Sequence, residues 1–351
     1  MLTVSMIVKD EAPVIEKSLQ AIKKYGYEIV VVDTGSKDNT KEISFKYTDK
    51  VYDYKWNNNF SEARNFAIEK AENEFVLMID ADEVIIDFNK EAVEKLIKLN
   101  EKSLGRISVI SEFEDGGTVS RSVEKVSRLF SKKYYKYQGL IHEQLVGINY
   151  SKNEMYELPI KVLHNGYDLK EIKRKDKINR NLSMLEKELK LKPNDPYILY
   201  QLGKTYYMAE DYEKAYVYFN KVMDIDLDVN LEYVQNLIEC YGYLLIKMKR
   251  YSEALNLVNL YDVFSKSSDF VFLIGLIYMN NGMFNEAINE FLKASKMYNG
   301  KIVGVNNNLS FYNIGVIYEC LGQVKEAERF YEKCSGYMPA EDRLKIISKS
   351  Y

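Results

Sequence analysis

The chain has 351 residues, and its 49 basic and 52 acidic side chains give a formal net charge of −3. This length allows two or three domains, and the balanced charge argues against a nucleic-acid partner because no strong positive field is present. The longest apolar run, 271–279, is too short to span a bilayer, and the three cysteines show no C-x-x-C spacing. We therefore expect a cytoplasmic protein without a transmembrane segment.

Short apolar runs alternate with segments of helical spacing in the first half of the chain. The strand-like runs are Leu2–Val8, Glu28–Val32, Val51–Tyr54 and Phe75–Ile79, and the helix-like segments are Pro13–Lys24, Thr40–Lys46 and Glu62–Ala71. Asn39, three residues before Glu42, predicts a capping box at the start of the second helix. This alternation predicts an α/β fold with a mostly parallel, three-layer sheet. Longer β-like stretches after about residue 106 extend the same domain.

Helical spacing dominates the second half and includes a repeat. Four glycines are each followed twelve residues later by an alanine, namely Gly203, Gly242, Gly275 and Gly315 by Ala215, Ala254, Ala287 and Ala327. An aromatic side chain stands four residues after the alanine in three units, as Phe219, Phe291 and Tyr331, whereas the second unit has Val258. Small residues let the two helices of a hairpin approach closely, and large ones fill the gap. The pattern resembles the tetratricopeptide repeat, so we expect domains at 1–167 and 196–351 joined by a helical linker at 168–195.

Acidic side chains follow the most apolar strand-like run of the chain. Asp80, Asp82 and Glu83 come directly after Phe75–Ile79. Ligand sites in open α/β sheets lie beyond the carboxyl ends of such strands. Three carboxylates there suit a hard cation such as Mg²⁺ or Mn²⁺ bound together with substrate phosphates. The alternative is an acidic loop whose charges are simply solvated.

Other polar residues fall at the ends of neighbouring strands. Glu11 follows the first strand, and Asp33 follows the second. Asp33 either accepts hydrogen bonds from a base or ribose hydroxyl, as strand-end acids do in nucleotide sites, or caps its own turn. Arg64 lies in a helix that begins near Ser61, where it either pairs with a diphosphate or forms a surface ion pair with Glu62 or Glu69.

These motifs together resemble the family 2 glycosyltransferases, which have the GT-A fold. The motifs are, in order, S-M-I-V-K-D-E, V-V-V-D-T-G-S-K-D-N-T, F-S-E-A-R-N and M-I-D-A-D-E, followed by R-L-F at 128–130, G-L-I-H-E at 139–143 and H-N-G-Y at 164–167. The resemblance covers roughly residues 1–170. A transferase domain followed by tetratricopeptide-like repeats is also similar to the sublancin-type peptide S-glycosyltransferases.

The resemblance implies a nucleotide-sugar donor and inversion at the anomeric carbon. By motif matching, Glu11 and Asp33 contact the uridine of a UDP-sugar, and Arg64 contacts the diphosphate region. Asp80 faces the ribose and the metal, and Asp82 ligates Mg²⁺ or Mn²⁺ directly. The metal would stabilise the charge that builds on the departing diphosphate.

An acceptor hydroxyl or thiol that attacks from the opposite face needs a general base. Glu143 is our candidate, with Asp115 and Glu112 in reserve; the alternative for Glu143 is that it binds an acceptor group or pairs with a cation. The only two histidines, His142 and His164, both fall in family-like motifs. Each is either a structural residue or a third metal ligand or phosphate contact.

We thus expect an inverting, metal-dependent hexosyltransferase that moves a sugar from UDP-glucose or UDP-N-acetylglucosamine to Cys, Ser or Thr of a peptide or protein. The helical repeats would hold the acceptor, because such repeats present extended concave surfaces, and could also form a homodimer. One alternative is a transferase acting on a cell-envelope or lipopolysaccharide-core sugar. Alternatives of another kind are a non-catalytic repeat scaffold and a nucleotide-sugar hydrolase.

Overall fold

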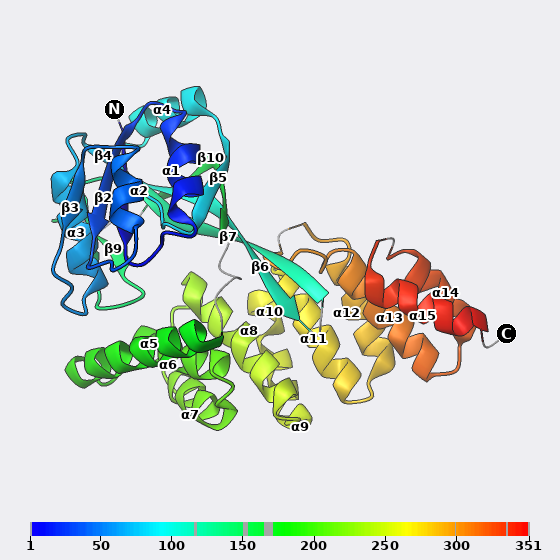
Figure 1. The fold of residues 1–351 in the computed structure, drawn as a ribbon. Coiled ribbons are helices and arrows are strands. Elements are labelled where there is room, and N and C mark those ends of the chain that lie inside the picture. Colours follow the sequence, from blue (N-terminus) through cyan, green and yellow to red (C-terminus); the bar gives the residue numbers. More distant parts are fainter. Residues whose placement is uncertain are drawn as a thin grey trace. The chain divides into compact units, whose positions relative to one another are not determined.

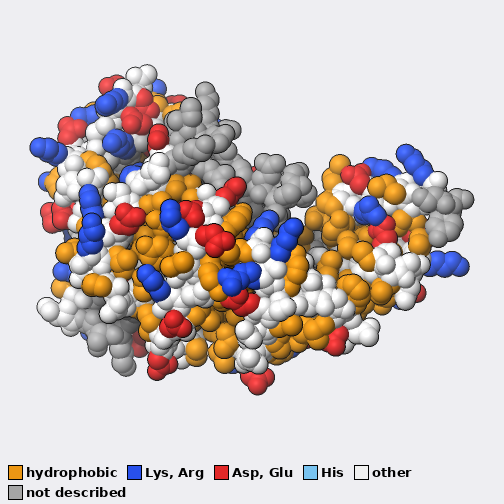
Figure 2. Space-filling model, turned by 90° about the horizontal axis from the view of Figure 1, so that it is seen from below, with side chains coloured by type: hydrophobic (Ala, Val, Ile, Leu, Met, Phe, Trp, Pro, Cys, Tyr) orange, Lys and Arg blue, Asp and Glu red, His pale blue; other side chains and the backbone are white. Residues whose placement is uncertain are grey.

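The computed structural model describes residues 2–115, 118–149, 154–164, 171–298, 300–334 and 336–349. For 113–115, 118–120 and 171–175 it describes the backbone only. The chain divides into two compact units (Figure 1). The first comprises residues 1–113 and 121–188, and the second comprises residues 114–120 and 189–351. Charged side chains of both signs are interspersed with hydrophobic ones over the face shown in Figure 2.

An eight-stranded sheet forms the centre of the first unit, with the order β3-β2-β1-β4-β7-β6-β10-β5. Its strands are β1 (Leu2–Val8), β2 (Glu28–Asp33), β3 (Val51–Asp53), β4 (Phe75–Met78), β5 (Glu83–Phe88), β6 (Leu104–Asp115), β7 (Thr118–Ser131) and β10 (Met155–His164). β1 pairs in parallel with β2 and β4, β2 with β3, and β6 with β10, whereas β7 and β5 pair antiparallel with β4 and β10. The expected mostly parallel sheet is confirmed.

Two layers cover the faces of this sheet. One face packs against α1 (Ile15–Lys23) and α4 (Lys90–Leu99), whose buried side chains join the largest apolar cluster. The other face packs against α3 (Phe60–Lys70) and a two-stranded sheet of β8 (Tyr135–Gln138) and β9 (Gln144–Gly147). Because β1, β2 and β4 are parallel, the loops that follow them meet at one edge of the sheet.

A bulge interrupts the pairing of β5 with β10. Lys161 pairs with Asp87, but the next residue, Val162, pairs with Ile85. Ile86 is the extra residue of β5, and it is 51% exposed. Beyond the bulge, His164 lies opposite Glu83. The bulge therefore sets which residue of β5 faces His164.

One helix start differs from the expectation and another agrees with it. Asn39 precedes α2 (Thr40–Phe45) but makes no side-chain cap, so the expected capping box is wrong. The neighbouring Asp38 accepts the Thr40 N–H instead, at 3.0 Å. The third helix begins at Phe60, next to the expected Ser61, and the Asn59 side chain caps it by accepting the N–H of Glu62.

The second unit consists of helical hairpins. Its helices are α6 (Pro196–Met208), α7 (Tyr212–Met223), α8 (Glu232–Lys247), α9 (Tyr251–Ala254), the 3-10 helix η2 (Leu255–Leu260), α10 (Tyr261–Phe264), α11 (Ser268–Asn280), α12 (Phe284–Ala294), α13 (Asn308–Cys320), α14 (Val324–Glu332) and α15 (Met338–Lys349). A further helix, α5 (Glu171–Leu191), runs between the sheet and these hairpins in the sequence. Within the described ranges, no helix is both long enough and apolar enough to cross a membrane.

The predicted small-residue positions are the points of close helix approach. A Cβ added to Gly203 would lie 2.4 Å from Phe219, and one added to Gly315 would lie 2.5 Å from Tyr331. The second repeat unit is irregular, because its glycine, Gly242, lies against Leu273 of α11 and Leu257 of η2 in place of an aromatic residue. The glycine positions of the repeat pattern thus mark where helices pack closely, but in the second repeat unit leucine side chains replace the aromatic one.

Replacing Gly203 with alanine should destabilise the second unit by about 1–3 kcal/mol, because the new methyl group overpacks the contact with Phe219. Urea denaturation of the full chain measures this loss. Adding Phe219→Leu to Gly203→Ala makes room for the methyl group, so the double variant should lose less than the sum of the two single variants. Strictly additive losses would contradict this packing.

Candidate functional site

Two loops at the carboxyl edge of the sheet are joined by hydrogen bonds. The Asp10 N–H donates to Ser36 Oγ at 3.0 Å, and the Lys37 N–H donates back to Asp10 Oδ1 at 2.7 Å. The Glu11 N–H donates to Thr40 Oγ1 at 2.7 Å. These bonds bring Glu11, after β1, to the same edge as the loop that follows β2.

Asp33 both caps its turn and leaves one acceptor unused. Its Oδ1 accepts the N–H groups of Gly35 and Ser36, each at 2.8 Å. Its Oδ2 is buried and has no hydrogen-bond partner among the described residues, and the residue as a whole is 3% exposed. A buried acceptor without a donor is costly, so a ligand N–H or O–H here would be well matched.

Two guanidinium groups hold the Asp80 carboxylate. Arg64 Nη2 donates to Asp80 Oδ1 at 2.8 Å, and Arg128 Nη2 donates to Asp80 Oδ2 at 2.7 Å. Burial alone would raise the pKa of Asp80, but Arg128 and Arg64 hold that pKa well below its usual value. Asp80 is therefore a fixed anion, and both of its oxygens are engaged by arginine.

Glu83 shapes the turn that carries Asp80 and Asp82. Its Oε2 accepts the Asp80 N–H at 2.9 Å, and its Oε1 accepts from Arg128 Nη2 at 3.0 Å. The side chain is 3% exposed, and burial raises the pKa of Glu83 despite the nearby Arg128. These bonds give Glu83 a structural role in this turn.

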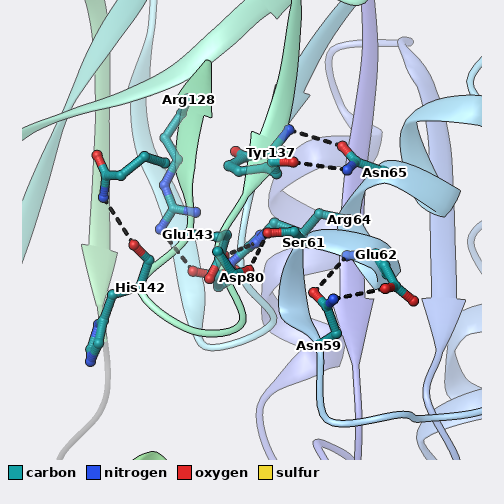
Figure 3. Close-up of polar contacts among 12 residues, drawn as sticks. Asn59, Ser61, Glu62, Arg64, Asn65, Asp80, Arg128, Tyr137, His142 and Glu143 are labelled. Carbon is teal, nitrogen blue, oxygen red and sulfur yellow. Dashed lines mark hydrogen bonds and ion pairs between the residues drawn. The ribbon is translucent and has the colours of Figure 1, made fainter. Parts of the chain in front are cut away.

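Arg64 lies between Asp80 and Glu143 (Figure 3), with its side chain only 9% exposed. Its Nε donates to Glu143 Oε1. The alternative of a surface ion pair with Glu62 or Glu69 is therefore wrong, because both carboxylates that Arg64 bonds come from other parts of the chain. Its Nη1 is buried without an acceptor among the described residues.

Glu143 ends a short loop between β8 and β9 that also carries His142. The Glu143 side chain is 10% exposed, and its carboxylate lies against Arg64. His142 adopts a left-handed backbone conformation with φ of +50°. Its imidazole points away from Asp80 and Glu143 (Figure 3). The loop therefore brings Glu143, but not His142, to the charged cluster.

Asp82 lies against His164, at the end of β10. The distance from His164 Nε2 to Asp82 Oδ2 is 3.1 Å, and Ser111 Oγ lies 3.3 Å from His164 Nδ1. The hydrogen bond to Asp82 raises the pKa of His164 despite partial burial. The rest of its motif, residues 165–167, lies outside the described residues.

The pKa of His164 should therefore exceed the ordinary histidine value of about 6.5 in the metal-free protein. NMR titration can show this directly, because the chain has only two histidines. Asp82→Asn should lower the pKa of His164, and Asp87→Asn, on the exposed part of β5, should not. A raised folded-state pKa adds stability that is complete below the unfolded value and is lost as the pH rises through the folded value. Identical titrations in all three proteins would contradict the pairing.

The donor atoms at this edge suit a divalent cation that shares its ligands with a substrate. No group of three or more His, Cys, Asp or Glu side chains is arranged for a metal within the part of the chain that the structure describes. Asp82 and His164 supply one carboxylate and one imidazole, and Mg²⁺ or Mn²⁺ commonly binds through few protein ligands plus phosphate oxygens and water. The residues therefore fit a metal completed by a diphosphate. Both oxygens of the Asp80 carboxylate bond arginines.

Comparison with known proteins agrees with this geometry. Residues 3–157 match the model of glycosyl transferase family 2. Apart from residues 114–120, this match lies within the first unit, which therefore contains a region similar to family 2 glycosyltransferases. Residues 196–229, 268–300 and 310–339 match the tetratricopeptide repeat, so such repeats follow the family 2 match along the chain. The irregular second repeat unit is not among the matched residues.

The chain aligns with curated relatives over part of its length. The glycosyltransferase SunS of Bacillus subtilis strain 168 is 32% identical over 225 residues, which cover 63% of this chain and 52% of SunS. A TPR repeat-containing protein of Synechococcus elongatus is 30% identical over 56% of this chain and 50% of its own length. The chain thus spans about half the length of the curated relatives it matches.

Among solved structures, the TPR protein YrrB, described as having an unusual peptide-binding site, is 22% identical with a TM-score of 0.41. It covers 48% of this chain and 84% of its own. MamA is 20% identical with a TM-score of 0.39 over 52% of this chain and 99% of its own.

The sequence did not show how the charges at this edge of the sheet pair. Arg128 was part of a family-like motif without a role, and the structure places it on Asp80 and Glu83. Tyr137 was not singled out, although its ring lies 5.4 Å from the Arg64 guanidinium carbon and burial raises its pKa to about 12. The sequence signal for Arg128 was its place in the R-L-F motif at 128–130.

Proposed function

We propose that this chain transfers a sugar from a UDP-sugar, with UDP-glucose and UDP-N-acetylglucosamine as the first candidates, to Cys, Ser or Thr of a peptide or protein. The observation that carries the proposal is the shared edge of the sheet. The loops that follow β1, β2 and β4 meet at this edge, where Glu11, Asp33 and Asp82 lie. Arg64 bonds both Asp80 and Glu143. A sugar donor and an acceptor side chain could therefore come together at this edge of the sheet.

The uridine would bind next to Asp33 and Glu11. The support is the buried Asp33 Oδ2, which lacks a donor among the described residues and could accept the N–H of a uracil ring. Because Oδ1 is committed to two backbone N–H groups, the carboxylate is held in one orientation for this contact. A fixed acceptor favours a base with a complementary donor over one without.

The metal would be held by Asp82 and His164 and completed by diphosphate oxygens. When bound, Mg²⁺ or Mn²⁺ supplies charge stabilisation to the departing diphosphate. Asp80 would face the ribose side while its arginines keep it ionised. Arg64 already bonds two carboxylates, so its contribution in this proposal is to orient Asp80 and Glu143; a direct contact with the diphosphate would require it to leave one of them.

Glu143 would act as the general base. It would take the proton from the acceptor thiol or hydroxyl as that atom attacks the anomeric carbon, opposite the leaving UDP, which gives inversion. The pairing with Arg64 keeps the carboxylate in one place. The helical repeats would present the acceptor, since such repeats offer extended concave surfaces for peptides.

The direct test is a donor panel. The full chain is incubated with individual UDP-sugars and Mn²⁺, with and without candidate peptides that contain Cys, Ser or Thr, and UDP release and peptide mass are measured. A transferase gives UDP release together with a glycosylated peptide. Free sugar with every peptide present would indicate a hydrolase, and no release with any donor would favour a repeat scaffold.

A further inference from the structure

The loop that ends at Glu143 needs support from its surroundings. This loop comprises residues 139–143 and is called the Glu143 loop below. Two of its residues, Gly139 with φ of +111° and His142 with φ of +50°, adopt left-handed backbone conformations. Glycine adopts such a conformation readily, but a histidine does so at a cost and keeps it only where neighbouring groups hold the backbone. The position of the Glu143 carboxylate therefore depends on what holds this loop.

Asn65 of α3 holds the strand that leads into the loop. Its Nδ2 donates to the Tyr137 carbonyl, and its Oδ1 accepts the Tyr137 N–H, both at 2.9 Å (Figure 3). The side-chain amide thus satisfies both backbone groups of one residue of β8, as a neighbouring strand would. Among side chains, only asparagine and glutamine carry a donor and an acceptor in this arrangement.

The same face of α3 continues the contact into the loop. Ser61 Oγ donates to the Gly139 carbonyl, and the Phe60 N–H donates to the Leu140 carbonyl at 2.9 Å. Positions 60, 61, 64 and 65 share one face of a helix, so a single rigid element holds β8, the loop backbone and, through the Arg64 side chain, Glu143 itself.

We infer that Asn65 is a positioning residue for acceptor activation: by fixing Tyr137 it sets where the Glu143 loop presents its carboxylate. The inference rests on the proposed function, in which Glu143 is the base. Asn65 acts through backbone hydrogen bonds, so its loss should slow the chemical step without weakening nucleotide binding.

Asn65→Asp is the sharpest variant. It keeps the size of the side chain and the oxygen that accepts the Tyr137 N–H, but it places a second oxygen against the Tyr137 carbonyl. Ser61→Ala, which removes the bond to Gly139 alone, is a second variant in case the first folds poorly. Asn89→Ala is the matched control, because Asn89 caps α4 through the Ala92 N–H and does not take part in the contacts that hold the Glu143 loop.

UDP release from the donor that works best with the parent protein gives the first readout. Asn65→Asp should lower kcat by about 10-fold or more. The Kd for UDP with Mn²⁺ should change less than about twofold, because the donor-side residues keep their contacts. Combined with Glu143→Gln, it should add almost nothing, since both substitutions act on the same base. Effects that multiply in the double variant, or a parallel loss of UDP affinity, would overturn the inference.

Amide hydrogen exchange over residues 137–143 gives a readout that does not need turnover. Exchange there should be faster in Asn65→Asp than in the parent and in Asn89→Ala. Unchanged exchange overturns the inference even if the enzyme is active. A Glu143→Gln variant with full activity would instead refute the proposed base, while faster exchange in Asn65→Asp would still support the role of Asn65 in holding the loop.

Discussion

Asp82→Asn is expected to lower metal-dependent UDP release by about 10²-fold or more, because the departing diphosphate loses the cation that stabilises its charge. The asparagine keeps the size of the side chain and can still bond His164, so the turn after β4 should keep its shape. Rates are measured across a Mn²⁺ series, and Mn²⁺ binding is measured by calorimetry in the presence of UDP. Weaker Mn²⁺ binding should accompany the slower rate.

The matched control for this substitution is Asp87→Asn. Asp87 lies on β5 and pairs with the exposed Lys161 at 3.1 Å, away from the acidic turn. We expect the parent rate and the parent Mn²⁺ affinity in this variant. If Asp82→Asn behaves like Asp87→Asn, or if chelation of the metal leaves the parent rate unchanged, Asp82 is not a functional metal ligand.

Glu143→Gln is expected to lower the transfer rate by about 10²- to 10⁴-fold, the range attributed to a positioned general base. Glutamine retains an oxygen that can accept the Arg64 Nε–H, so the loss should come from missing basicity more than from a moved arginine. The kcat for transfer should fall while UDP affinity stays within a few-fold of the parent value.

Glu62→Gln is the control for Glu143→Gln. Glu62 lies on the same helix as Arg64, but its carboxylate accepts from Asn57 and Asn59 at the exposed start of α3. If Glu143→Gln keeps the parent rate and loses only stability, Glu143 is a structural partner of Arg64, and Glu112 becomes the base to test. The side chain of the other reserve candidate, Asp115, lies outside the described residues.

The first four strands of the first unit could be predicted from sequence because each is short and rich in apolar residues. Leu2–Val8 is predicted to the residue, and the other three runs differ from the observed strands by a single residue at the C-terminal end. Helix starts were harder. Asn39 and Asn59 are the same residue type before a helix, yet only Asn59 caps, because at the other helix the preceding Asp38 bonds the first N–H group.

The charge pairing at the site could not be predicted, because it joins residues that are distant in the sequence. Arg64 lies on α3, Asp80 lies in the turn after β4, and Arg128 lies on β7. No local sequence pattern says which carboxylate each arginine bonds. A motif match supplies residue identities and family roles, but it carries no information on how buried charges neutralise one another. The assignment of Arg64 to the diphosphate alone was therefore incomplete.

The second repeat unit shows the same limit at the level of packing. A pattern of glycine, alanine and aromatic residue describes a hairpin that fills its own gap. Gly242 departs from this pattern because Leu273, from the next hairpin, occupies the space together with Leu257. Sequence spacing showed that the unit was unusual, but only the fold identifies the side chain that replaces the aromatic residue.

The bulge in β5 has a consequence for tolerance to insertion and deletion. Ile86 is exposed and unpaired in the ladder, which marks a position where the loss of one residue is harmless. Removing Ile86 makes the pairs Lys161–Asp87 and Val162–Ile85 consecutive, so the ladder becomes regular and Glu83 stays opposite His164. The bulge therefore holds one spare residue. Loss of a second residue between Glu83 and Asp87 could not be absorbed and would slide the start of β5 one residue along β10. Because successive residues of a strand point to opposite faces, that slide would separate Asp82 from His164. A two-residue deletion in β5 is thus predicted to act as a mutation at the candidate site.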